Sequence, residues 1–285
     1  MPGAKRVVVV TDSTSYLPVG VGEALGVHVV PLQVELAGTG GREGSEITPE
    51  QVTEVLRRHG LVTTSRPAPA EFLECYRALL DDGADEIVSV HLSARLSGTC
   101  DSARLAAREV GEGAVTVVDS RATAMALGFS VMAAAQAAAD GAGAGSVVEA
   151  ARRCIERSSA LFYVDSLEWL RRGGRIGTAA AMVGTALSVK PLMQLVEGQI
   201  VPLEKVRTSA KAIARLVQLS VQAAGDDEVD VAVQHLAAPE RAEELALQLK
   251  ELLPALHDLH ISEVGAVVGA HVGPGLLGVV VRRRD

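Results

Sequence analysis

A chain of 285 residues exceeds the usual size of a single hydrophobic core, so we expect two domains. The net charge of −8 and the 2% aromatic content argue against a general binder of nucleic acids or anionic membranes, which needs basic surface and stacking platforms. Hydrophobic residues make up 48% of the chain, so the core is aliphatic.

The cysteines and the start of the chain point to a cytoplasmic protein. Cys75, Cys100 and Cys154 are widely spaced and lack CxxC spacing, which is typical of reduced thiols. Residues 1–6 lead directly into a short apolar run without the features of a secretory signal. Every long apolar segment is interrupted before the roughly 18 residues that cross a bilayer.

Short apolar runs alternate with amphipathic runs through the first half of the chain. Residues 6–10 are typical of a buried parallel strand, and the polar residues that follow include Asp12 and Ser13. Residues 27–36 predict a second strand, 38–41 a flexible loop, and 48–59 a helix that begins with a capping box at Thr48. Further strands are predicted at 87–90, 114–118 and 161–164, and helices at 70–80, 101–110, 123–139 and 146–157.

The pattern changes after Ser166. A short helix at 167–172 ends in two glycines, and a segment rich in small residues extends to 188. A hairpin around Gly198 precedes a helix (209–223), a strand (229–234), a helix (239–252) and a strand (259–264). A loop at 265–275 holds His271, and a strand at 277–281 closes the chain. We predict an α/β fold of two domains: a mainly parallel α/β domain (1–160) and an α+β domain with a mixed sheet (161–285).

Hydroxyl-rich loops follow several predicted strands. Thr63, Thr64 and Ser65 precede a proline-stiffened loop and a helix, and Ser93 with Ser97-Gly98-Thr99 opens another helix. On its own, Ser97 reads as a helix cap, and Asp12 with Ser13 reads equally as turn chemistry or as part of a site. The recurrence of hydroxyls beside helix N-termini favours a second interpretation, a site for an anionic group.

Several familiar site chemistries are missing from the sequence. There is no phosphate-binding P-loop, nucleophile elbow, dinucleotide fingerprint or zinc-type Cys/His pair. His257 and His260 lack a nearby third ligand, so we expect no metal and no cofactor. A serine hydrolase or acyl-transfer enzyme that uses Ser97 and His271, with Asp119, is the alternative hypothesis.

The residues favour a carboxylate ligand with an apolar tail. Hydroxyls and helix-start amides can hold a carboxylate without a fixed cation, and an aliphatic interior can hold the tail. His271 lies in a glycine-rich segment of the second half.

Six ordered stretches together resemble the DegV family of fatty-acid-binding proteins. They are residues 11–15, 64–69, 96–99 with 102–103, Leu167 and Leu170 with 173–176, Lys190-Pro191 with Gly198 and 205–208, and His271 with 273–275. The resemblance covers nearly the whole chain. It implies two domains with one long-chain fatty acid buried between them. The residues implied to bind its carboxylate are Thr64, Ser65, Ser97, Gly98 and His271, and the implied neighbours of the head group are Thr63, Ser93, Asp12 and Ser13. The resemblance leaves open whether Ser93 or Ser97 makes the direct contact.

The resemblance also implies a partner. FakB-like members of the family are carrier subunits in phospholipid metabolism: they do no chemistry themselves and present the acid to a separate ATP-dependent fatty acid kinase. Transient membrane contact for lipid exchange is also expected. The basic residues implied to dock the kinase are Arg171, Arg172, Lys205 and Arg207. Two departures from the family pattern, Arg66 and Cys100-Asp101, adjoin the implied carboxylate site.

Overall fold

The computed structural model describes residues 5–182 and 190–284, which fall into two compact units. Unit 1 consists of Met1–Gln33 and Ser65–Glu156, and unit 2 of Val34–Thr64 and Arg157–Asp285. This grouping differs from the predicted continuous division in one segment, residues 34–64, which joins the second half. The reason is that helix α2 (Pro49–Arg57) packs against helix α10 (Ala266–Val272). No helix in the described ranges is long and apolar enough to cross a membrane.

Unit 1 contains a four-stranded parallel sheet. Its strands lie in the order β2 (His28–Val30), β1 (Val7–Asp12), β6 (Glu86–His91) and β7 (Val115–Asp119). All six residues of β1 are buried, as expected for a parallel strand with both faces covered. The predicted strand at 27–36 is in fact two strands, β2 and β3 (Gln33–Leu36).

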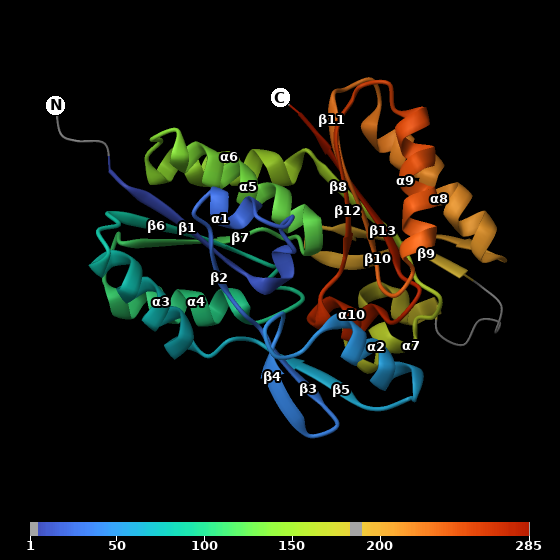
Figure 1. Cartoon of the computed structure of the whole chain (residues 1–285), viewed down its shortest axis with the longest axis horizontal. Coiled ribbons are helices and arrows are strands. Elements are labelled where there is room, and N and C mark those ends of the chain that lie inside the picture. Colours follow the sequence, from blue (N-terminus) through green and yellow to red (C-terminus); the bar gives the residue numbers. More distant parts are fainter. Residues whose placement is uncertain (1–4, 183–189, 285) are drawn as a thin grey trace. The chain divides into compact units, whose positions relative to one another are not determined.

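Helices cover both faces of this sheet. Figure 1 shows α3 (Pro69–Asp81) and α4 (Thr99–Val110) together on one side, with α5 (Ala124–Ala139) and α6 (Ala144–Glu156) on the other. Aliphatic strand residues pack with Phe72 and Tyr76 of α3 in the core. The helix α5 is apolar around its whole circumference, which suits a buried helix. Two short helical segments complete the unit, η1 (Ser13–Ser15) and α1 (Val21–Ala24).

Unit 2 contains a six-stranded mixed sheet. The order is β10 (Gln199–Val206), β9 (Lys190–Val196), β8 (Ser158–Tyr163), β13 (Leu277–Arg283), β11 (Val229–His235) and β12 (Leu256–Glu263). Strands β11 and β12 are parallel, whereas the other neighbours are antiparallel. The fold class is therefore α/β with one parallel and one mixed sheet, as predicted.

Two long helices pack against the strands of this mixed sheet. The helices α8 (Ser209–Ala224) and α9 (Pro239–Leu252) lie side by side and bury an aliphatic core against β8, β11 and β13. The short helix α7 (Glu168–Arg172) contacts α10 and is followed by η2 (Gly177–Met182). The predicted segment rich in small residues extends beyond η2 into 183–189, outside the described residues.

Three predicted loops are regular structure instead. Residues 38–41 largely form β4 (Thr39–Arg42), and the Thr63–Ser65 loop forms the end of β5 (Val62–Ser65), in a small sheet ordered β4-β3-β5. The predicted loop at 265–275 contains α10, so His271 lies on a helix. All of its apolar residues except the half-buried Val268 are buried, and Gly269 lies close to Leu236. Tertiary packing therefore stabilises a helix that its glycines obscure in the sequence.

Gly128 lets α5 approach η1 closely. A Cβ atom at Gly128 would lie 2.5 Å from the Ser15 carbonyl oxygen. Gly128→Ala is therefore expected to lower the stability of unit 1 by about 1–3 kcal/mol through overpacking. The matched control is Gly145→Ala in α6, where a Cβ meets no atom within 4 Å and alanine should be neutral or stabilising. Urea denaturation midpoints check both, and equal midpoints for the two variants would contradict the close approach.

Candidate functional site

Asp12 ends β1 with a fully buried carboxylate, 0% exposed, that accepts four hydrogen bonds. Oδ1 accepts from the Thr14 amide (3.1 Å) and the Thr14 hydroxyl (2.6 Å). Oδ2 accepts from the Leu92 amide (2.9 Å) and lies 3.0 Å from His91 Nδ1. Asp12 therefore fixes the turn after β1 and the loop after β6 to each other.

The hydrogen-bond chain continues from His91 into the core. His91 Nε2 lies 2.7 Å from Ser89 Oγ, which lies 2.8 Å from the Tyr76 hydroxyl. Ser89, His91 and Asp12 thus have the connectivity of a catalytic triad, but all three side chains are fully buried and have no room for a substrate. Ser89, His91 and Tyr76 were not predicted from the sequence as part of a network. The available signal was two polar residues at alternate positions of a β-strand, which share one face.

The other hydroxyls of unit 1 also have identifiable roles. Ser13 Oγ accepts from the Leu32 amide (3.0 Å). Ser93 is buried, and its Oγ accepts from the Arg95 amide (3.1 Å) at the start of the turn that leads to Ser97. Ser97 Oγ pairs with Thr99 Oγ1 at 2.9 Å, so this pair retains one hydroxyl hydrogen to donate to a ligand.

Gly98, rather than Ser97, is the N-cap of α4, and no side chain caps this helix. The Arg66 side chain packs on Gly98 so closely that a Cβ there would overlap the guanidinium. A guanidinium thus adjoins the positive end of the α4 dipole, an arrangement that an anion would stabilise. The arginine at position 66, which departs from the family pattern, therefore places a positive charge beside Gly98.

The second departure from the family pattern, Cys100-Asp101, makes contacts within the protein. Cys100 is buried, and its thiol donates to the Leu92 carbonyl oxygen at 3.5 Å. Burial raises the pKa of Cys100 to about 12, so the side chain stays a thiol. Asp101 is exposed and pairs with Arg104 at 3.1 Å.

In unit 2, Thr64 and His271 meet although 207 positions separate them in the chain. Thr64 Oγ1 lies 2.8 Å from His271 Nε2. Thr64 comes from β5 and His271 from α10. Strand alternation places Thr63 and Ser65 on the opposite face from Thr64, so the three hydroxyls do not form one cluster.

The His271 ring is held in a neutral state. Burial, with a smaller effect of the Arg175 charge, lowers the pKa of His271 to about 4. Nδ1 is buried and has no hydrogen-bond partner among the described residues. An unpaired acceptor is less unusual than an orphaned N–H, which favours the tautomer with hydrogen on Nε2. In that tautomer Nε2 donates to Thr64 Oγ1, and the Thr64 hydroxyl hydrogen is left to donate to a ligand.

The glycine motifs of unit 2 are places of close packing around α7 and α10. A Cβ at Gly173 would lie 2.0 Å from His271 Nδ1. Gly273 approaches the Trp169 ring equally closely, and Gly275 approaches the Asp165 carboxylate; both have positive φ. These glycines therefore let α7, the His271 helix and the segment after it come together.

The four predicted docking residues are exposed. Arg171 and Arg172 lie on α7, where Arg172 pairs with Glu168 (2.5 Å) and lies 5.1 Å from the Trp169 ring centre. Lys205 lies near the end of β10, and Arg207 follows that strand.

A cluster of possible metal ligands in the described part of unit 2 contains His257 but not His260. His257, Asp230 and Asp258 offer ligand atoms within 4.8 Å of one another. The Arg284 guanidinium, however, lies 2.8 Å from Asp230 Oδ1 and 2.9 Å from His257 Nδ1. An arginine already supplies the positive charge that this cluster attracts.

Comparison with known proteins identifies the family. The model of the DegV family of uncharacterised proteins matches residues 6–284. A DegV domain-containing protein of Streptomyces coelicolor is 54% identical, over 99% of this chain and 100% of its own. This chain therefore belongs to the DegV family.

Solved structures agree with this assignment. A DegV family protein from Thermus thermophilus, described by its fatty acid binding, has a TM-score of 0.93 at 34% identity and covers 98% of this chain and 100% of its own. DegV from Bacillus subtilis, described as a fatty acid binding protein, has a TM-score of 0.88 at 33% identity with the same coverage.

Loss of the Asp12 charge should destabilise unit 1. In Asp12→Asn, an amide NH₂ would face N–H and O–H groups that now donate hydrogen bonds to the carboxylate. This change is expected to lower the free energy of unfolding by about 3 kcal/mol. The control is Asp101→Asn, whose exposed pair with Arg104 should contribute less than about 1 kcal/mol. Urea denaturation measures both, and similar midpoints would contradict the role given to Asp12.

His271 should remain neutral down to about pH 4. Because its folded-state pKa lies below the ordinary value of 6.5, protons favour the unfolded chain. The stabilising contribution is complete above about pH 6.5 and declines as the pH falls toward about 4. NMR titration of the ring resonance, assigned with His271→Gln, measures the pKa, and a value near 6.5 would contradict the buried neutral ring.

Proposed function

We propose that this protein binds one long-chain fatty acid and that Thr64, Ser65, Ser97, Gly98 and His271 hold its carboxylate. The observation that carries the proposal is the full-length similarity to DegV proteins described as fatty acid binding, one of them at a TM-score of 0.93. Thr63, Ser93, Asp12 and Ser13 are the proposed neighbours of the head group.

The donor chemistry supports a carboxylate ligand. The Thr64 hydroxyl can donate because His271 donates to its oxygen, and the Ser97–Thr99 pair has a second hydrogen to donate. The uncapped start of α4 and the Arg66 guanidinium add positive potential beside Gly98. Together these donors offset the several kcal/mol that desolvation of a carboxylate costs.

An aliphatic interior suits the acyl chain. A sixteen-carbon acid has about 14 methylenes, and at roughly 0.8 kcal/mol each their burial contributes about 11 kcal/mol at most. Ordering of the chain and desolvation of the head reduce this value. We expect the acid to survive purification.

The proposed physiological role is presentation of the carboxyl group to a separate ATP-dependent kinase in the cytoplasm. There, a carboxylate oxygen attacks the terminal phosphorus of ATP, and an acyl phosphate and ADP form. Arg171, Arg172, Lys205 and Arg207 are the proposed docking residues, and brief membrane contact would allow lipid exchange. This chain would need no cofactor and would do no chemistry itself.

The hydrolase alternative lacks support from the geometry. His271 Nε2 lies at the Thr64 hydroxyl, and no described residue hydrogen-bonds to Nδ1, so no carboxylate orients the ring. Asp119 Oδ1 instead accepts from the Ala94 and Arg121 amides, at 3.1 and 2.9 Å.

Native mass spectrometry tests the proposal directly. The purified protein should carry an excess mass of one fatty acid, which is lost on denaturation and recovered by lipid extraction. If lipid-free, refolded protein bound none of the acids from 14 to 18 carbons, the proposal would be wrong.

The head-group contacts can be tested with a control threonine outside the proposed site. Thr64→Ala and Ser97→Ala should each remove a donor worth about 1–3 kcal/mol, so retention of the acid should fall about tenfold or more. Thr116→Ala changes an exposed threonine on β7, outside the proposed site, and should retain the acid. Competition with a fluorescent fatty acid measures retention. Undiminished retention in the Thr64→Ala/Ser97→Ala double variant would mean that the head group binds elsewhere.

Docking can be separated from lipid binding. Arg207→Ala should leave the bound acid in place and lower the rate of phosphorylation by the partner kinase, because a cation for the interface is lost. Arg152→Ala, an exposed arginine on α6, is the control and should support the normal rate. Loss of lipid from Arg207→Ala would instead place Arg207 in the ligand site.

A further inference from the structure

A pocket of about 610 Å³ in unit 2 adjoins the carboxyl ends of the parallel strands β11 and β12. Its walls come from α2, from His235 at the end of β11, from Ala237 and Pro239 at the start of α9, and from Glu263 at the end of β12. The crevice outside the carboxyl ends of parallel strands is the usual ligand position in α/β folds. None of its lining residues belongs to the proposed fatty-acid site.

Two buried polar atoms beside this pocket have no partner among the described residues. Thr53 is 4% exposed and His235 is 7% exposed, and neither Thr53 Oγ1 nor His235 Nδ1 makes a hydrogen bond. The nearest charged group to His235 Nδ1 is Glu263 Oε1, at 3.8 Å. Unsatisfied buried groups cost about 1–3 kcal/mol each, and a bound ligand would satisfy them.

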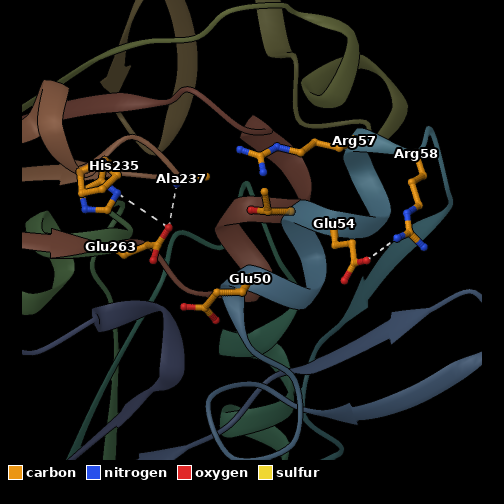
Figure 2. Close-up of a pocket in the computed structure, with 9 residues that line it drawn as sticks. Glu50, Glu54, Arg57, Arg58, His235, Ala237 and Glu263 are labelled. Carbon is orange, nitrogen blue, oxygen red and sulfur yellow. Dashed lines mark hydrogen bonds and ion pairs between the residues drawn. The ribbon is translucent and has the colours of Figure 1, made fainter.

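The pocket also holds unpaired charges of both signs. Arg58 pairs with Glu54 at 2.5 Å, whereas Arg57 has no ion pair in the described structure and extends across the pocket toward Ala237 (Figure 2). Glu263 Oε1 accepts from the Ala237 amide at 2.7 Å, which leaves its second oxygen available. The Glu50 carboxylate points to the side on which Glu263 lies (Figure 2).

The protonation states of Glu50 and His235 determine which charges the pocket offers. The hydrogen bond from Thr48, and that from its own backbone amide, lower the pKa of Glu50, so its carboxylate is ionised at neutral pH. Burial lowers the pKa of His235, so its ring is neutral and Nδ1 either donates or accepts. The free groups are therefore one guanidinium, two carboxylates and two neutral hydrogen-bonding atoms.

We infer that this pocket binds a small zwitterion, a molecule with an ammonium and a carboxylate group such as a free α-amino acid. The carboxylate pairs with Arg57, and the ammonium pairs with Glu50 and Glu263. A simple anion would be repelled by the two carboxylates and a simple cation by Arg57, whereas a zwitterion presents the opposite charge to each of these groups. Ala237 and Pro239 offer apolar surface to the rest of the ligand.

Isothermal titration calorimetry of the full chain with each of the twenty protein amino acids tests this inference. Acetate and methylammonium, each with half of the charges, are titrated in parallel. At least one amino acid should bind with a Kd below about 1 mM, and the two half-ligands should bind at least tenfold more weakly. If no amino acid binds at about 10 mM, or if a half-ligand binds as well, the inference is wrong.

Variants locate the binding. Arg57→Gln and Glu263→Gln should each raise the Kd at least about tenfold, since each removes one charge, and glutamine at 263 still accepts from Ala237. The control is Arg152→Gln, an exposed arginine on α6 that does not line the pocket, which should leave the Kd within about twofold. An Arg57→Gln protein with unchanged affinity would overturn the assignment to this pocket. All of these variants should retain fatty acid, so this result is independent of the proposed function.

Discussion

The hydrogen bonds to the Asp12 carboxylate are the constraint on which unit 1 depends. A charge in this aliphatic interior costs several kcal/mol unless every lone pair is used, and four donors reach it here. Two of the donors belong to the turn after β1 and two to the end of β6 and the residue after it. Because these donors must converge on one carboxylate, the loop that carries the Ser93 and Ser97 hydroxyls begins at a fixed position. The same buried anion orients His91, which extends the network through Ser89 to Tyr76.

The candidate site residues of unit 2 are positioned by contacts of a different kind. Its candidate groups are positioned by close backbone approach, since Gly173 packs on the His271 ring and Gly273 packs on Trp169. The consequence is a neutral histidine that serves as a hydrogen-bond donor to Thr64. In the proposed site, the histidine would act on the ligand through the threonine hydroxyl, as a positioning residue. Each unit thus offers its own chemistry: unit 1 has a helix dipole beside a cation, and unit 2 has an oriented hydroxyl.

The sequence predicted the alternation of strands and helices well, because a short apolar run such as Val7–Val10 is expected only in the buried interior of a sheet. It also indicated Thr64 and His271, through the family resemblance. It failed where tertiary contacts override local signals. The glycines around His271 suggested a loop, yet packing on α2 makes a helix. The prolines after Ser65 concealed a strand, and nothing local showed that residues 34–64 belong with the second half. The buried Ser89–His91 pair was overlooked because its partner Asp12 is remote in sequence.

The interrupted path of the chain has a consequence for biosynthesis. Residues 34–64 leave the ribosome early, but α2 packs on α10 and Thr64 bonds to His271, which is synthesised 207 residues later. All of unit 1 is available once residue 156 has emerged, whereas unit 2 must wait for the last part of the chain. Co-translational folding therefore has an obligatory order, in which the apolar face of α2 stays without its partner until translation is nearly complete.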